Sequence, residues 1–482
     1  MIPIDVGQSV TQRGGDSART AHWVQSAFTT VNVSKMAMDA NFKANFSGEM
    51  SAVPLFLAST TPGKGLFFAA TTQNNVYALD ETTGATVWMH NIGAQRTGGP
   101  GPGLNNRGIV GTPVIDATAR VIYVAAAMAA GRHEIHALSV DTGNEVTGWP
   151  VDVSKVKSGN VTFNFNDQNQ RSALSLVNGI LYVAFGGYFG DGGNYHGWVV
   201  SVKTSDPTQV AGWATLGGQE GIWAAGGLAS DGNGVFAITG NSNAGNPRTN
   251  TDSEEIIRIT GMSVPNRDNN NLFYPDIWAS GMNNGDKDFG SCSPSVITVP
   301  NSTPSKLVVA PAKPGRVYFL DAAKLGGSAG QLSDIVVADT GAESVYTAPS
   351  TFQSGATTIV AISTQIGSAC PGGASNGNIM GISMTPGTPP MPHIKWCASM
   401  NSGDDEVRRR SPISTNSNAA GADPVVWFMS GSNLVAFNGD TGVAIPFTSG
   451  TCDGVRRFSS PIAANGRIIV GGNGHLCSWS VH

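Results

Sequence analysis

Basic side chains are scarce in this chain, and their chemistry suits the binding of an anion. Only 13% of the 482 residues are charged, so cations that recur at one kind of position in a repeated pattern stand out. An arginine guanidinium binds a carboxylate or phosphate through two parallel hydrogen bonds, and several around one cavity predict an anionic ligand. The candidates are Arg107, Arg171, Lys313, Arg408, Arg409, Arg410, Arg456 and Arg457.

Aromatic and acidic residues alternate with these cations along the chain. Trp223 could stack on a flat ring of a ligand, and Tyr188 belongs to the same group of positions. A second interpretation remains open, because the arginines could instead tie neighbouring repeats together by capping carbonyl groups or by pairing with acids. Those acids are Asp286, Asp288, Asp404 and Asp405.

Tyr195 and His196 form the only Tyr-His pair in the chain. Beside Arg171, which could neutralise a carboxylate, the pair could supply an acid or base for proton abstraction. That chemistry would suit a lyase or hydrolase acting on an acidic glycan. A packing role for His196 is the alternative.

Short apolar strands recur eight times and must position these residues. The pattern of Asn75–Gly84, an alternating run that ends in a turn, returns to the C-terminus at intervals typical of a propeller blade. In a propeller, the start of each inner strand and the loop between the second and third strands open on one face, so their side chains converge around the axis. The inner strands are marked by a proline near their start, at Pro54, Pro113, Pro294, Pro349, Pro412 and Pro461.

We therefore predict an all-β fold, an eight-bladed propeller over residues 35–482 with an N-terminal extension over residues 1–34. No residues remain after His475–His482 for the outer strand of the last blade. The extended run Lys35–Ser47 can supply it and close the ring. Seven blades is the alternative, because the fourth repeat, Gly221–Ser280, is irregular.

Five cysteines indicate where the chain resides. Their positions suggest local bridges from Cys370 to Cys397 and from Cys452 to Cys477, with Cys292 left over, and such bridges persist in oxidising compartments. We expect a secreted or periplasmic protein whose export signal is absent from the given chain. The net charge of −5 argues against a nucleic-acid partner, and no apolar run is long enough for a membrane span.

The repeat, with its Ala-Leu-Asp…Thr-Gly ending and a following Trp, resembles the quinoprotein alcohol dehydrogenase-like propellers over roughly Gly14 to His482. Active members of that family hold pyrroloquinoline quinone and calcium in the central funnel. The resemblance implies quinone contacts for Arg107 and Lys313, a stacking floor at Trp223, a calcium ligand at Asn241, and a catalytic aspartate at Asp286 or Asp288.

Two departures from the family pattern bear on these cofactors. Gly101-Pro102-Gly103 stands where the family has an adjacent cysteine pair, and the calcium-binding glutamate expected after Ile180–Gly186 is absent. A calcium ion needs several oxygen ligands, so its binding should weaken unless Asp191 substitutes.

Three hypotheses about function follow. The first is an exported propeller that binds a small anionic ligand, an acidic glycan or a protein partner at a cationic funnel that includes Arg107, Arg171, Lys313, Arg409 and Arg456, without redox chemistry. The second is a noncanonical quinone-dependent dehydrogenase. The third is the acidic-polysaccharide lyase or hydrolase with Tyr195 and His196 in its site.

Overall fold

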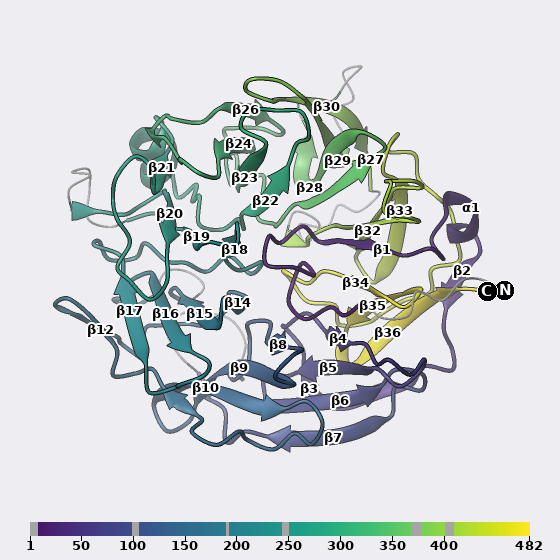
Figure 1. The fold of residues 1–482 in the computed structure, drawn as a ribbon, viewed down its shortest axis with the longest axis horizontal. Helices are drawn as coiled ribbons and strands as arrows, with labels where there is room; N and C mark the ends of the chain where they lie inside the picture. The colour runs from purple at the N-terminus through teal and green to yellow at the C-terminus, as the bar shows by residue number, and fades with distance from the viewer. Residues whose placement is uncertain are drawn as a thin grey trace.

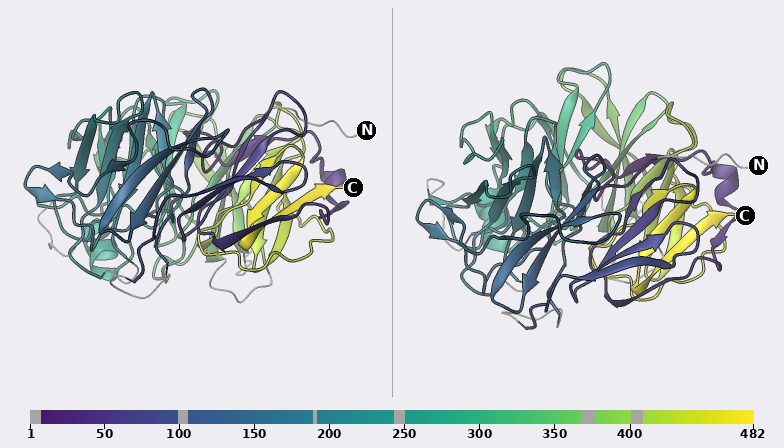
Figure 2. Two further views of the ribbon diagram at one scale, coloured as in Figure 1. Left: turned by 90° about the horizontal axis from the view of Figure 1, so that it is seen from below. Right: turned by 60° about the horizontal axis from the view of Figure 1, so that its bottom comes forward.

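The computed structural model describes residues 8–98, 106–188, 192–242, 250–367, 370, 377–400 and 409–482. Within these residues, eight sheets of four or five strands surround a common centre (Figure 1). Consecutive strands of each sheet pair antiparallel, and in side view the ring forms a flattened disc (Figure 2). The prediction of an eight-bladed propeller is confirmed, and the seven-bladed alternative is wrong.

Within the described residues, six blades contain a four-stranded meander that runs from the axis to the rim, and the other two combine three consecutive strands with strands from the N-terminal part of the chain. The first four blades are β4–β7 (Leu55–Leu57, Leu66–Ala70, Asn75–Asp80, Thr86–Asn91), β8–β11 (Val114–Asp116, Val121–Met128, Arg132–Ser139, Val151–Asp152), β14–β17 (Ser175–Val177, Ile180–Phe185, Trp198–Lys203, Val210–Ala214) and β18–β21 (Ala229–Ser230, Val235–Ile238, Ile256–Ile259, Leu272–Tyr274).

The next four blades complete the ring. They are β22, β23, β24 and β26 (Ser295–Thr298, Lys306–Ala312, Arg316–Asp321, Ser333–Val336), β27–β30 (Ser350–Ser354, Thr357–Gly367, Gly377–Thr385, Met391–Ala398), β31–β33 (Ile413–Asn416, Val425–Ser430, Asn433–Asn438) with β1 (His22–Val24), and β34–β36 (Ile462–Ala464, Arg467–Gly471, Asn473–Val481) with β2 (Met36–Met38) and β3 (Ala44–Glu49).

Small additional elements decorate this plan. They are the helix α1 (Thr30–Val33), the ribbon of β12 and β13 (Lys157–Ser158, Val161–Thr162), the helical turns η2 and η3 (Trp278–Met282, Asn283–Gly285), and β25 (Gly327–Ser328), which pairs in parallel with β21. No helix in the described part of the chain is long and apolar enough to cross a membrane.

Every proline singled out in the sequence immediately precedes an inner strand. Pro54 stands before β4, Pro294 before β22 and Pro461 before β34, for example. Proline has no N–H to donate, and the first residue of an edge strand tolerates that loss. These prolines therefore mark where the chain enters the channel wall.

The turn and tryptophan of the repeat join neighbouring blades. Asp80 accepts hydrogen bonds from the backbone N–H groups of Thr82 and Thr83, which closes the turn between β6 and β7. On β7, Trp88 donates from Nε1 to the Val140 carbonyl of the next blade, 2.9 Å away. Its ring packs on Gly143, where a Cβ would come within 2.6 Å of the ring. Glycine is required here by this close approach and by its φ of 73°.

The hydrophobic core lies between the blades. One cluster, for example, combines Phe68 and Ala78 of the first blade with Ile122 and Leu138 of the second. Because each blade buries its two faces against its two neighbours, the ring is stable only when it is closed.

The ring closes in the eighth blade. β2 and β3, from the N-terminal part of the chain, pair antiparallel with β36, β2 along the end of that strand and β3 along its beginning. This confirms that the N-terminal run Lys35–Ser47 supplies the missing strand. Disulfides join Cys370 to Cys397 and Cys452 to Cys477, and Cys292 is a buried free thiol. The predicted cysteine pairing is therefore confirmed.

The segment of residues 8–25, called here the N-terminal plug, runs into the middle of the ring (purple in Figure 1). It exchanges hydrogen bonds with every blade. These contacts are, in blade order, with Phe56, Ile115, Leu174, Ser230, Val296, Thr351, Ser414 and Gly466.

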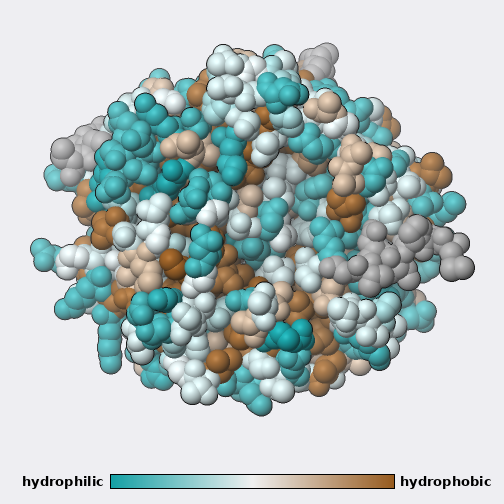
Figure 3. Space-filling model, in the orientation of Figure 1, coloured by the Kyte–Doolittle hydropathy of each residue, from teal (hydrophilic) through white to brown (hydrophobic). Residues whose placement is uncertain are grey.

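Arg19 anchors the N-terminal plug. Its side chain is 1% exposed and donates to the carbonyls of Leu228 (3.0 Å), Arg13 (2.6 Å) and Leu174 (2.8 Å) and to Ser175 Oγ (2.5 Å). A shallow cavity of about 610 Å³ lies beside the plug, where it meets the turns after the inner strands. On the face drawn in Figure 3, apolar side chains are scattered among polar ones.

Candidate functional site

A cavity of about 230 Å³ lies where the loops of six blades converge. Its lining comes from the loops that precede inner strands and from the loops between second and third strands, as the propeller geometry predicts. These loops lie at one mouth of the central channel, and the turns beside the N-terminal plug lie at the opposite mouth. The lining residues are Arg171, Gly187, Tyr188, Trp223, Asp286, Asp288, Ser291, Lys313, Glu343, Tyr346, Arg409 and Phe458.

Lys313 forms the charged side of this pocket. Its ammonium lies 2.6 Å from Asp288 Oδ2, 3.2 Å from Glu343 Oε1 and 3.8 Å from Asp286 Oδ1. Burial alone would lower the pKa of Lys313, but the charge and hydrogen bond of Asp288 outweigh it, so the pKa is raised. Lys313 therefore stays charged, and its charge is balanced by acids.

Glu254 lies close to this charged group. Its side chain is fully buried, and its Oε2 accepts a hydrogen bond from the backbone N–H of Phe289 at 2.5 Å. Burial, reinforced by the charge of Asp288, raises the pKa of Glu254 well above its ordinary value. Burial and the charge of Asp288 therefore both act toward the protonated form of Glu254.

Two arginines of the lining lie over aromatic rings. The Arg171 guanidinium lies 4.7 Å from the ring centre of Phe458, and that of Arg409 lies 4.4 Å from the ring centre of Tyr346. Arg171 also donates from Nε to the Trp223 carbonyl at 2.9 Å. Contact with an aromatic ring limits the movement of each guanidinium, whose N–H groups can bind a carboxylate in two parallel hydrogen bonds.

Trp223 forms a rigid flat wall. A Cβ on Gly221 would come within 1.7 Å of its ring, and a Cβ on Gly186 or Gly240 within 2.7 Å. Three glycines thus leave just enough room for the indole, and the Tyr195 ring meets it edge-on at 6.0 Å between ring centres. Such a wall suits stacking of a flat ligand.

The structure brings seven of the predicted site residues to this pocket and places the others elsewhere. Those in the lining are Arg171, Tyr188, Trp223, Asp286, Asp288, Lys313 and Arg409. Arg107 lies one layer behind, 4.4 Å from the ring centre of Tyr188. Burial lowers the pKa of Arg107.

Tyr195 and His196 do not line the described cavity. Tyr195 is completely buried beneath Trp223. The His196 ring makes a hydrogen bond of 3.0 Å through Nδ1 with the Thr215 carbonyl. This places both between loops of the third blade.

Asn241 lies beside the pocket, with its backbone N–H 3.4 Å from Asp288 Oδ1. Two other predicted cations connect loops instead. Arg410 donates to the carbonyls of Met429, Gly431 and Val455, and Arg456 pairs with Glu49 at 2.5 Å. Arg457 is exposed, while Arg408, Asp404, Asp405, Asp191 and Gly101–Gly103 lie outside the described residues.

Besides Gly187, which has no side chain, sequence reasoning missed four lining residues: Ser291, Glu343, Tyr346 and Phe458. All four come three to six residues before the proline that opens an inner strand, so counting back from each proline would have found them. Phe458 has a φ of 64°, which a non-glycine residue rarely adopts. Its carbonyl accepts a 2.6 Å hydrogen bond from Arg13 of the N-terminal plug.

The eight-bladed fold is similar to that of quinoprotein dehydrogenases. The chain is similar to a quinohemoprotein alcohol dehydrogenase from Comamonas testosteroni, with a TM-score of 0.63 and 14% identity over 98% of this chain and 80% of that one. Quinohemoprotein alcohol dehydrogenase ADHIIG from Pseudomonas putida HK5 gives a TM-score of 0.66 and 12% identity over the same shares.

A europium-containing methanol dehydrogenase gives a TM-score of 0.58 and 13% identity over 96% of this chain and 89% of that one. At these identities the likeness concerns the fold. No family model and no curated protein sequence matches the chain.

The described residues do not fit a calcium-bound quinone of the kind that the resemblance implies. Trp223 suits a stacked ring, but a calcium ion needs six to eight oxygen ligands. Gly187 and Tyr188 occupy the neighbourhood of the expected glutamate. Asp288 Oδ2 already accepts from Lys313 (2.6 Å) and from Ser291 Oγ (3.0 Å). Two neighbouring side-chain oxygens, Asn241 Oδ1 and Glu254 Oε1, are buried without a hydrogen-bond partner. Together with both oxygens of Asp288 they would supply four ligands, fewer than the six that a calcium ion needs.

Proposed function

We propose that this chain is an extracytoplasmic binding propeller whose central pocket takes a small, flat molecule bearing a carboxylate. The observation that carries the proposal is the pairing of the Trp223 wall with two arginines of the same lining that lie over aromatic rings. The two disulfides support an oxidising location.

Charge in the pocket favours recognition of a ligand with both acidic and polar groups. The described lining holds three cations, Arg171, Lys313 and Arg409, and three acids, Asp286, Asp288 and Glu343. Lys313 lies 2.6 Å and 3.2 Å from the nearest acidic oxygens, and Arg171 and Arg409 supply the guanidinium groups that we propose meet the anion. Asp286, whose side chain is 65% exposed, can accept hydrogen bonds from ligand hydroxyl groups.

Binding assays with defined probes test this proposal. Isothermal titration with pyrroloquinoline quinone, used as a flat tricarboxylate without calcium, and with galacturonate should show saturable binding to at least one, while quinoline, which lacks carboxylates, should bind at least tenfold more weakly. Arg171→Ala and Arg409→Ala should each weaken binding at least tenfold, because a hydrogen bond to a charged group contributes about 1.5–3 kcal/mol.

Arg132→Ala is the matched control, because it removes the same charge from an exposed position on β10 and should leave the affinity unchanged. Equal binding of quinoline and the tricarboxylate, or an equal effect of all three arginine variants, would contradict the proposal. Reduction of an artificial electron acceptor only after addition of quinone and calcium would favour the dehydrogenase alternative. An ultraviolet absorbance rise on an acidic polysaccharide would favour the lyase.

A further inference from the structure

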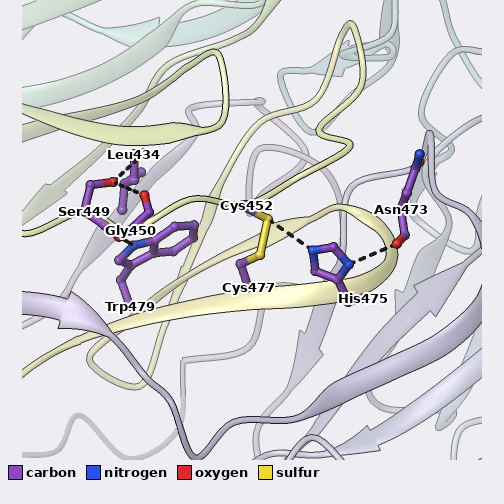
Figure 4. The surroundings of a disulfide bond; sticks show 8 residues. All are labelled: Leu434, Ser449, Gly450, Cys452, Asn473, His475, Cys477 and Trp479. Atoms are coloured by element: carbon purple, nitrogen blue, oxygen red, sulfur yellow. Dashed lines mark hydrogen bonds between the residues drawn. A yellow bond between two sulfur atoms is a disulfide. The ribbon is translucent and has the colours of Figure 1, made fainter.

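Cys452, His475 and Cys477 form a compact group at the eighth blade, and none of them lines the central pocket. Figure 4 shows the His475 ring lying beside the disulfide, with Nε2 directed at Cys452 Sγ at 3.9 Å. One ligand atom from each of the three residues lies within 4.8 Å of the other two. In the described residues this is the only such group of three histidine, cysteine or acidic side chains.

Hydrogen bonding selects the tautomer of His475. Its Nδ1 lies 2.9 Å from the backbone carbonyl of Asn473, and a carbonyl only accepts, so Nδ1 carries the proton. In the neutral ring, Nε2 then presents its lone pair to the sulfur atoms. A histidine whose other nitrogen donates to a carbonyl is the usual arrangement of a metal-binding histidine.

The surrounding backbone holds the group in place. His475 pairs with Asn45 of β3, and Cys477 pairs with Val470 of β35. On the other side, the backbone N–H of Cys452 donates to the Ser432 carbonyl at 2.8 Å. Both cysteines are buried and His475 is partly exposed, so the group has rigid ligands with one side open to solvent.

We propose that reduction of the Cys452–Cys477 disulfide opens a binding site for one thiophilic cation of the zinc type, with Cys452, Cys477 and His475 as ligands. Two thiolates and an imidazole are ligands that zinc prefers. Zn–S bonds of about 2.3 Å in tetrahedral geometry place two ligand sulfurs about 3.8 Å apart. Bonded sulfurs lie about 2.05 Å apart, so side-chain rotation has to increase the distance between the two sulfurs by less than about 2 Å.

The electron and proton balance needs an external dithiol. A dithiol reductant gives two electrons and two protons to the S–S bond, which breaks to two thiols while the dithiol closes to its own disulfide. Binding of the divalent cation then releases the two thiol protons and forms two metal–sulfur bonds and one metal–nitrogen bond. The fourth position is left for water.

Cobalt(II) and zinc(II) are the probes for the test. The full chain, reduced with a dithiol that is then removed without oxygen, should bind one equivalent of Co²⁺ with a thiolate-to-cobalt charge-transfer band. Zn²⁺ should displace Co²⁺, and the oxidised chain should show no band. His475→Ala should weaken Co²⁺ binding at least tenfold, while His393→Ala, on the exposed edge of β30, should leave it unchanged.

The second disulfide supplies an internal control. Cys370→Ser with Cys397→Ser should retain the band and its stoichiometry, whereas Cys452→Ser with Cys477→Ser should abolish them. Should the reduced chain lose its fold, zinc must restore the far-ultraviolet circular dichroism of the native chain, because metal binding then adds to folding. Absence of the band and of refolding, or a band that survives the Cys452 and Cys477 substitutions, would overturn the proposal.

Discussion

Replacement of Arg19 by alanine tests whether the N-terminal plug holds the ring together. Its guanidinium makes four hydrogen bonds inside the channel. At about 1.5 kcal/mol for each hydrogen bond to a charged group, these sum to about 6 kcal/mol. Removing them should loosen both the plug and the inner strands it joins.

Burial of the charge offsets part of this gain. Burial lowers the pKa of Arg19 to about 10 from 12.5, which corresponds to about 3 kcal/mol against the charged form. The alanine variant escapes that cost but leaves a cavity, so we expect a net loss of about 3–5 kcal/mol in the free energy of unfolding. For a chain of 482 residues, an unfolding entropy of about 2.1 cal/mol/K per residue converts this loss to about 3–5 °C in Tm.

Thermal melting by circular dichroism or calorimetry checks the magnitude. Arg120→Ala is the control, because Arg120 also forms a paired contact, with Asp141, but both side chains are about half exposed. Surface pairs contribute less than about 1 kcal/mol, so its Tm should fall by about 1 °C or less. Trypsin should cut after Arg13 sooner in the Arg19→Ala variant, since that bond lies in the plug. Equal Tm shifts for the two variants would refute the anchoring role.

Three further predictions concern buried groups. His133 is buried, and burial lowers its pKa to about 4. Its contribution to the free energy of unfolding is therefore complete above pH 6.5 and is lost as the pH falls toward 4. Denaturant titrations at pH 4.5 and 7 should show that the free energy of unfolding falls less between these pH values in His133→Phe than in the wild type. Glu254 has a raised pKa, so its contribution to the free energy of unfolding is complete below pH 4.5 and decreases as the pH rises. The Tm of Glu254→Gln minus the Tm of the wild type should therefore be larger at pH 8 than at pH 4.5. Gly221→Ala should displace Trp223, because the new Cβ would come within 1.7 Å of the indole, and should weaken ligand binding at least tenfold while tryptophan fluorescence shifts.

Much of the fold could be predicted because its determinants are local. The proline before each inner strand and the Asp…Thr-Gly turn act within a few residues, and the same short pattern returns with each blade. Closure could be inferred by counting strands, since the last blade lacks one and the chain before the first blade is extended. Even the cysteine partners, 27 and 25 residues apart, lie in one or adjacent hairpins.

The site was only partly predictable because its contacts join residues of different blades. Arg409 and Arg410 are adjacent, yet Arg409 stacks on Tyr346 in the pocket while Arg410 donates to three carbonyls. Successive residues of an extended loop point in different directions, and nothing in the local sequence distinguishes a ligand-facing guanidinium from one that caps carbonyls. The carbonyl-capping interpretation is confirmed for Arg410, while ligand binding by Arg409 stays a prediction.

The N-terminal plug shows the same limit most clearly. Its residues have no alternating apolar pattern, and its partners lie up to 445 positions away, as with Arg13 and the Phe458 carbonyl. Inner strands present unpaired backbone groups to the channel, and arginine, with five donors on one planar group, can satisfy several carbonyls at once. Because Arg13 also holds Phe458, on whose ring Arg171 stacks, the segment that fills the channel also shapes the pocket at its opposite mouth.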